Sequence, residues 1–413
     1  MHPEKDYAQH VLENPDSIQN IAVCFYYGRS GSFLLSSLFD DHPQVLSVPP
    51  HALTDFVEKV STFDITRNAR IEDIISFVVS SFPYLFCETE RTGLHHRYGD
   101  EMDEDCGVPQ QAFVACMAKS LTSMAQRNIQ AQDWYGLIFK IIHISYACAA
   151  NRRIKSGNPM IFYQCHNYNP YTISILEKLL GQPRFITCVR NPVKTFDSHL
   201  VHHLEENPAP PFRELYTSLL TLLFNSGVCV QGIDEKRSCA VRFEDMHADT
   251  ENLMRALSRW LGIDFDESLL QSTVDGKTYW FPTAGGVYKQ GVNPKAAASR
   301  GLTILGRTDA IMLRHCLQAY YRDWKYEDAH GTCKDFWVRK CLLYIPPKVM
   351  RRLFVSEVWQ AIVNRELAEL GDLLSRHVYQ WGRIRSLYKE KIGKRDTGEH
   401  IIHLVDGNTS GET

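Results

Sequence analysis

The sequence predicts an α/β fold in which a central, mainly parallel five-stranded sheet lies between layers of helices. Two observations predict this fold. Short apolar runs with the length of buried strands alternate with segments whose apolar residues have helical spacing. Such alternation is typical of a parallel sheet that is covered by helices on both faces. The expected strands are residues 21–27, 44–48, 160–165, 185–189 and 238–243.

The first expected strand leads into a polar turn that reads Gly28-Arg29-Ser30-Gly31-Ser32, and a helix is expected over residues 33–39. A strand, a glycine turn and a helix together aim backbone N–H groups at an anion. Arg29 adds a guanidinium, which suits a forked anion such as a phosphate or a sulfuryl group. The turn lacks the Gly-Lys pair of a Walker motif, so a simple βα turn with two structural glycines is the alternative interpretation.

A second anion site is predicted where the strand over residues 185–189 ends. Arg190 follows this strand directly, and Asn191-Pro192 opens a helix in which Ser198 lies two turns further on. The carboxyl ends of parallel strands are where open α/β sheets bind ligands. Arg190 and Ser198 are therefore placed to hold one more anion, although a surface ion pair is the usual role of a lone arginine at such a position.

Taken together, these stretches resemble the superfamily of sulfotransferases that use 3′-phosphoadenosine 5′-phosphosulfate (PAPS). The turn matches the family's loop for the 5′-phosphosulfate, in the arginine form of carbohydrate and several bacterial members. Residues 188–198 match the 3′-phosphate site, including the eight-residue step from Arg190 to Ser198. Arg242-Phe243-Glu244-Asp245-Met246 is similar to the family's aromatic-Glu-Asp element. The resemblance extends over residues 21–262.

The resemblance implies a P-loop-type three-layer fold, PAPS as donor with PAP as product, and a hydroxyl or amine acceptor, with no metal. It also implies roles for individual residues. The loop from Gly28 to Phe33, including Arg29, Ser30, Gly31 and Ser32, would bind the 5′-phosphosulfate, and Phe243 would lie near the adenine. The basic section over residues 275–301 resembles a loop that closes over the nucleotide, with Lys289 and Arg300 as candidate contacts.

A histidine is expected to act as the general base, and two are candidates. His166 directly follows the third strand, and histidine has the intrinsic pKa for proton transfer near neutrality. The cytosolic branch of the family has its histidine at this distance from the 3′-phosphate arginine, within Lys-Thr-His; here Gln164 stands at the lysine position. His51 is the alternative, since it follows the second strand where other branches carry a glutamate. Arg29 is the expected catalytic cation.

The chain is predicted to divide at about residue 330. Residues 1–330 form the sulfotransferase-like domain, with residues 51–158 as a mainly helical insertion that shapes the acceptor site, and residues 331–413 form a C-terminal helical extension with a polar tail from Gly393. Further helices are expected at residues 71–79, 111–126, 137–153, 171–180, 214–225, 249–262, 308–324 and 355–376, and loops at residues 91–110 and 275–301.

Composition limits the partners. The 413 residues carry a formal charge of −3, so no basic excess favours nucleic acid. A small molecule, lipid, polyketide or glycan is the expected acceptor. Neither a secretory signal nor a stretch long enough to span a membrane is visible, and cysteines in apolar runs indicate a reducing, cytoplasmic setting. Trp337 and the apolar residues 342–345, close to basic residues, are compatible with contact with a membrane surface or with packing on the main domain.

Two other functions are considered. One is a P-loop nucleotide kinase or NTPase, but the chain's Gly276-Lys277-Thr278 lacks the earlier glycine and follows no clear strand. The other is a catalytically inactive relative that binds a nucleotide or a partner protein, which the glutamine at position 164 keeps open. His199, His202 and His203 have spacing that would permit a metal ion, but we interpret them as a solvated helix end.

Overall fold

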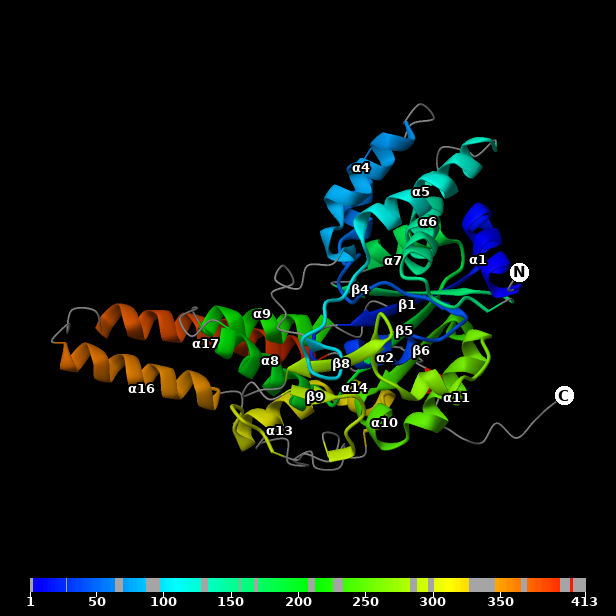
Figure 1. Cartoon of the computed structure of the whole chain (residues 1–413). Helices are drawn as coiled ribbons and strands as arrows, with labels where there is room; N and C mark the ends of the chain where they lie inside the picture. The colour runs from blue at the N-terminus through cyan, green and yellow to red at the C-terminus, as the bar shows by residue number, and fades with distance from the viewer. Residues whose placement is uncertain are drawn as a thin grey trace.

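A six-stranded parallel sheet runs through the centre of the protein (Figure 1). Its order is β10-β6-β5-β1-β4-β2. The computed structural model describes residues 3–26, 28–63, 70–86, 97–127, 133–155, 157–166, 170–206, 212–225, 233–282, 288–295, 301–326, 346–364, 370–393 and 402–403.

The five strands expected from the sequence are confirmed, and one more is added at the edge. They are β1 (Asn20–Tyr26), β2 (Val45–Leu46), β4 (Met160–His166), β5 (Arg184–Val189) and β6 (Ser238–Arg242). The sixth, β10 (Ile402–His403), pairs in parallel with Cys239 and Ala240 of β6. The expectation of a plain polar tail after Gly393 is therefore wrong at these two residues. Their backbone pairs with β6, which would otherwise present open N–H and C=O groups at the edge of the sheet.

Alternate residues of β1 enter two cores on opposite faces of the sheet. Ile21, Val23 and Phe25 pack with the helices of one face, whereas Ala22 and Cys24 pack with those of the other. The first face carries α1 (Pro3–Glu13), α3 (Phe56–Ser61), α4 (Ile71–Ser81), α5 (Gln110–Ala125), α6 (Trp134–Ala149) and α7 (Pro170–Leu180). The second carries α2 (Ser32–Phe39), α10 (Phe243–Ala248) and α11 (Thr250–Leu261).

A third core lies beyond the carboxyl ends of β5 and β6. It is built from α8 (Pro192–Glu206), α9 (Phe212–Asn225), α13 (Arg307–Cys316), α14 (Gln318–Asp323) and α17 (Leu370–Gly393), and α16 (Lys348–Val363) adds Met350. Trp324 at its centre is fully buried. Short 3-10 turns complete the helical part at Pro15–Ser17, Pro83–Leu85, Glu235–Arg237 and Glu267–Leu270.

Helices α3, α4, α5 and α6 lie between β2 and β4, and a buried ionic network connects the end of α6 to two distant parts of the chain. Arg152, just after α6, lies 2.8 Å from both Asp40 at the end of α2 and Asp275. The hydroxyl of Tyr146 on α6 donates to Asp275 at 2.8 Å. Each charge therefore has an opposite partner, as buried charges require.

Two segments expected to be loops instead form a small antiparallel sheet. β8 (Lys277–Pro282) pairs with β3 (Arg97–Tyr98), β7 (Thr273–Val274) and β9 (Tyr288–Gln290). The tight β7–β8 turn uses Asp275 and Gly276, both at positive φ. The paired residues Tyr98 of β3 and Tyr279 of β8 are far apart in the sequence, so no local pattern predicts their pairing.

The C-terminal helices differ from expectation in their boundaries. The helix expected over residues 308–324 is divided into α13 and α14. The one expected over residues 355–376 falls partly on α16 and partly on α17, with residues 365–369 outside the described part. Trp337 and residues 342–345 are also outside it. Among the described helices, none combines the length and apolarity that a membrane span needs.

Candidate functional site

The loop between β1 and α2 is held in a shape that only glycine permits at two positions. Gly31 has φ +94°, and a Cβ there would lie 2.6 Å from the ring of Phe243. A Cβ on Gly28 would lie 2.8 Å from the ring of His199. Arg29, between them, also has a positive φ of 56°. The loop is therefore pressed between α8 and α10, with its backbone turning towards the N-terminus of α2.

Two arginines and a serine from distant parts of the chain converge on this loop. The Arg29 Nε donates to Ser198 Oγ at 3.3 Å. The Nη1 of Arg190, which directly follows β5, donates to the carbonyl of Arg29 at 3.3 Å. The guanidinium of Arg190 also lies 4.5 Å from the centre of the Phe243 ring. Burial lowers the pKa of Arg190, and the charge of Arg29 lowers it further while Glu244 opposes the shift.

Two buried polar atoms at this point have no protein partner. Within the described part of the chain, neither the Oγ of Ser30 nor the Nε of Arg190 makes a hydrogen bond. Leaving such donors unsatisfied costs about 1–3 kcal/mol each, so they mark a place where a bound group supplies acceptors. A phosphate or sulfate oxygen is such an acceptor.

The aromatic-Glu-Asp element opens α10 and joins the two anion-binding segments. Phe243 packs against the loop, and Glu244 accepts from the backbone N–H of Asn191 at 3.2 Å. The other oxygen of Glu244 accepts from the Tyr326 hydroxyl at 2.8 Å. Asp245 pairs with Arg242 at 2.6 Å. Glu244 therefore connects the start of α10 to the segment that opens α8, whereas Asp245 fixes Arg242 at the end of β6.

His247 adds a buried imidazole beside Phe243 and connects it to the basic section. Its ring centre lies 4.4 Å from that of Phe243, and its Nδ1 accepts from the backbone N–H of Asn293 at 2.8 Å. Burial, together with the charges of Arg190 and Lys289, lowers the pKa of His247 to about 4. Lys289 is thus close enough to act on this site, whereas Arg300 lies outside the described residues.

The two candidate bases lie near each other, and His51 also lies next to Phe33. The centre of the His51 ring is 4.5 Å from that of Phe33 and 6.2 Å, edge on, from that of His166. The Nδ1 of His51 is 3.2 Å from Thr54 Oγ1. Burial lowers the pKa of His51 to about 4, with a further contribution from His166.

His166 has a different electrostatic environment, although it is close to His51. It is the last residue of β4 and is half-buried. Burial lowers its pKa, but the negative charge of Asp55 opposes this shift. At neutral pH both imidazoles are therefore uncharged, and His166 is the one that has a carboxylate near it to favour protonation.

Comparison with known proteins identifies the protein family of this chain. A sequence profile described as the sulfotransferase family matches residues 27–267, more than half of the chain. The chain belongs to the sulfotransferase family. The resemblance inferred from the sequence is thereby confirmed.

Solved structures with a similar arrangement are also sulfotransferases. One is the sulfotransferase domain from the curacin biosynthetic pathway, with 15% identity, a TM-score of 0.42 and coverage of 75% of this chain and 98% of that one. Another, from the Synechococcus PCC 7002 olefin synthase, has 17% identity, a TM-score of 0.41 and coverage of 72% and 94%. A sulfotransferase from Mycobacterium avium has 12% identity, a TM-score of 0.35 and coverage of 63% and 69%. No curated protein matches the chain significantly.

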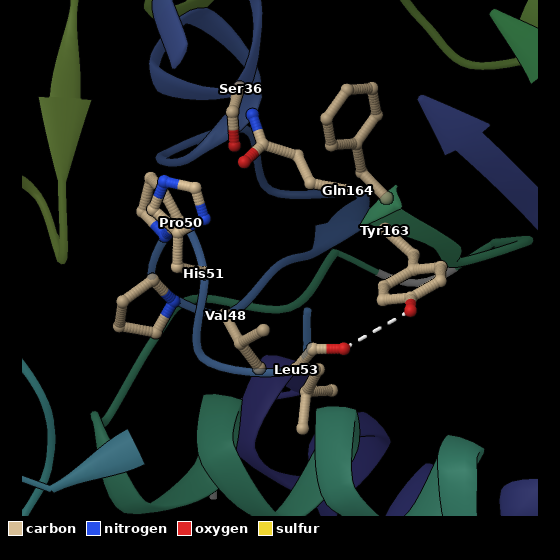
Figure 2. Close-up of a pocket in the computed structure, with 9 residues that line it drawn as sticks. Ser36, Val48, Pro50, His51, Leu53, Tyr163 and Gln164 are labelled. Carbon is tan, nitrogen blue, oxygen red and sulfur yellow. Dashed lines mark hydrogen bonds between the residues drawn. The ribbon is translucent and has the colours of Figure 1, made fainter. Parts of the chain in front are cut away.

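In this sulfotransferase-family chain Gln164 forms a hydrogen bond to the glycine loop. The Nε2 of Gln164 donates to the carbonyl of Ser32 at 2.8 Å, while within the described part its Oε1 has no partner. Figure 2 shows the amide of Gln164 pointing towards Ser36 in a small pocket. The pocket is otherwise lined by Val48, Pro49, Pro50, His51, Leu53, Phe162 and Tyr163.

Sequence reasoning misjudged His199. We expected a solvated helix end, but only 8% of His199 is exposed, and burial lowers its pKa to about 4. The signal was available, since His199 lies three residues after the buried Phe196 and one before the buried Leu200, on the inward face of α8. His202 and His203 are partly exposed. Among the described residues, no group of His, Cys, Asp or Glu is arranged to hold a metal ion.

Proposed function

We propose that this protein transfers the sulfuryl group of PAPS to a hydroxyl or amine of an acceptor. The observation that carries the proposal is the convergence of Arg29, Arg190 and Ser198 on one glycine loop. The buried Ser30 Oγ and Arg190 Nε there have no hydrogen-bond partner among the described residues. These groups are all donors. A ligand with two separate anionic groups, as in a 3′,5′-bisphosphorylated nucleotide, would satisfy them.

Each part of the loop region would hold one part of the nucleotide. The backbone N–H groups from Gly28 to Phe33, with Arg29 and the two loop serines, would bind the 5′-phosphosulfate at the N-terminus of α2. Arg190 and Ser198 would bind the 3′-phosphate. Phe243, whose ring already packs against Arg190, would contact the adenine, and Lys289 would add positive charge. Arg300 remains a sequence-based proposal.

When bound, PAPS supplies an activated sulfuryl group, and the chain's own residues do the rest. A neutral imidazole at His166 would take the proton of the acceptor, and the charge of Asp55 would stabilise the imidazolium that results. Arg29 would offset negative charge on the sulfuryl oxygens, because its backbone and Nε are already fixed by Arg190 and Ser198. No step requires a metal ion.

His51 is the second candidate for the base, and its surroundings favour a lesser role. Its pKa of about 4 makes it a weak proton acceptor at neutral pH, and Thr54 occupies its Nδ1. Its ring lies between Phe33 and His166, and this position suits orientation of the acceptor. Replacing His166 should therefore slow turnover far more than replacing His51.

For the acceptor we propose a molecule with an apolar part, such as a lipid, a polyketide or a hydrophobically substituted glycan. The pocket beside His51 supports this, since most of its lining residues are apolar. The polar side chains there are Ser36, His51, Gln164 and Tyr163, and the Tyr163 hydroxyl already donates to the carbonyl of Leu53. The first three could orient a single hydroxyl.

The surroundings of Lys277 do not support the kinase alternative. Gly276 lies in the turn between β7 and β8, and Lys277 and Thr278 are the first residues of β8, so this segment opens no helix. The Nζ of Lys277 donates to the carbonyl of Asp105 and lies 3.5 Å from Glu104. A phosphate-binding lysine would need to follow a glycine loop at a helix N-terminus.

Calorimetric titration with PAP, compared with ATP and Mg²⁺, tests the nucleotide directly. We expect metal-independent binding of PAP that is lost in Arg190→Ala and kept in Arg237→Ala, whose guanidinium pairs with Glu177 at 2.7 Å. Preference for ATP with Mg²⁺ would refute the proposal. Sulfation assays with PAPS and apolar alcohols then test catalysis, and PAP binding without turnover on any acceptor would indicate an inactive relative.

A further inference from the structure

Helices α16 and α17 form a hairpin that projects from the body of the protein and carries exposed apolar side chains (Figure 1). Most of these side chains form one row on each helix, and between 48% and 66% of each residue in the rows is exposed. Val363 and Tyr379, which are also exposed, lie further round their helices. The row on α16 is Val355, Trp359 and Ile362, and the row on α17 is Leu374 and Val378. Exposed apolar residues grouped in this way mark an interaction surface.

A single contact shows that both rows lie on the same face of the hairpin. The rings of Phe354 and His377 are 4.5 Å apart, about two turns from the joined ends of α16 and α17, so the helices run antiparallel and these residues face each other. An α-helix turns by about 100° per residue. Counted from Phe354 on α16 and from His377 on α17, each row lies roughly 60–140° round its helix, and both rotations follow the chain direction. Because the helices point in opposite directions, equal rotations bring the two rows to one side.

The same helical geometry shows on which face the charged side chains of α16 and α17 lie. Arg351 and Lys389, both exposed, fall on the face with the apolar rows, near the body of the protein. Glu357 and Asp372 fall on other sides. The two helices together hold eight Lys or Arg residues against three Asp or Glu, in a chain whose overall charge is −3. Positive charge is thus concentrated on this hairpin.

We propose that this face of the hairpin binds the surface of an anionic lipid bilayer. Trp, Ile, Leu and Val side chains with basic residues beside them are what an interfacial helix presents to headgroups and the outer acyl region. Anionic lipids would neutralise Arg351 and Lys389. A second copy of this face would instead set like charges against each other, and among the described residues of this face no carboxylate is present to offset them.

Sedimentation of the full chain with sucrose-loaded vesicles tests the proposal. We expect binding to phosphatidylcholine vesicles that contain phosphatidylglycerol, little binding to phosphatidylcholine alone, and release by high salt. Val378→Asp should weaken binding about tenfold, since it puts a charge into the apolar row. Tyr379→Asp is the matched control, because Tyr379 is 65% exposed but lies about 100° further round α17, off the proposed face.

Thermal melts monitored by circular dichroism show whether each variant is folded, and Trp359→Ser provides a second variant in the row on α16. The proposal is overturned if the chain ignores anionic vesicles or if Val378→Asp and Tyr379→Asp behave alike. It is also overturned if sedimentation equilibrium reveals a lipid-independent dimer that Val378→Asp dissociates, since the face would then be a contact between copies. The result does not depend on the proposed catalytic activity.

Discussion

Replacing Gly31 with alanine should destabilise the fold and disturb the nucleotide site together. At φ +94° an L-residue costs about 1–2 kcal/mol of left-handed strain. The new methyl would also lie 2.6 Å from Cδ2 of Phe243 and 2.8 Å from Cε of Met246. Moving these packed side chains aside adds about 1–3 kcal/mol. The free energy of unfolding should therefore fall by about 2–5 kcal/mol.

Gly262→Ala is the matched control for this experiment. Gly262 has φ +72° at the end of α11, and among the described atoms nothing lies within 4 Å of a Cβ there. It should lose only the backbone part, about 1–2 kcal/mol. The difference between the two variants isolates the contact of the loop with Phe243 and Met246.

Denaturant unfolding measures the free energy of unfolding, and calorimetric titration measures the affinity for PAP. Because Phe243 supports the Arg190 guanidinium at 4.5 Å, Gly31→Ala should also weaken PAP binding by about tenfold or more, equivalent to about 1.4 kcal/mol. Equal destabilisation by both substitutions, with unchanged PAP affinity in Gly31→Ala, would show that α10 does not press on the loop as described.

Three further predictions concern stability and catalysis. Arg152→Ala should lower the free energy of unfolding by about 3–5 kcal/mol in denaturant melts, since it leaves two buried carboxylates without a cation. Arg70→Ala, in an exposed pair, should leave the free energy of unfolding almost unchanged. His143 is fully buried and burial lowers its pKa to about 4, so the unfolded state binds the extra proton and stability falls as pH drops from about 6.5 to 4. His143→Gln should remove up to about 1.4 kcal/mol per pH unit from that slope, and an unchanged slope would contradict the assignment. His166→Ala should lower kcat by about 10²–10⁴ without loss of PAP binding, and His51→Ala should lower it less; the reverse order would make His51 the base.

The elements of the sheet could be predicted because their determinants are local. A strand buried on both faces must be a continuous apolar run, and residues 21–26 and 185–189 are such runs. The glycine turn followed by a helix, and the Asn191-Pro192 helix start, are likewise determined by neighbouring residues. The convergence of Arg29 and Arg190 then follows from the rule that parallel strands bring their carboxyl ends to one edge.

Contacts that depend on distant residues could not be predicted in this way. Arg152 reaches Asp40 across 112 positions and Asp275 across 123, and no spacing in the sequence pairs them. The pairing of β3 with β8 also joins residues that are far apart in the sequence. The burial of His199, in contrast, has a local determinant. His199 lies between the buried Phe196 and Leu200 on the inward face of α8, and this position outweighs its polar side chain.

The neutral Gln164 makes sense when its hydrogen bond is considered together with the position of Arg29. A lysine at position 164 would carry its charge on the sheet, whereas here the cation stands in the loop itself. Arg29 is fixed through Ser198 at its Nε and through Arg190 at its carbonyl, so its charge is held beside the turn. Gln164 contributes an amide that donates to Ser32 at the start of α2. A lysine there would be a third cation besides Arg29 and Arg190, and the pKa of Arg190 is already lowered by burial and by the charge of Arg29. A neutral donor supports the loop without adding to that positive charge.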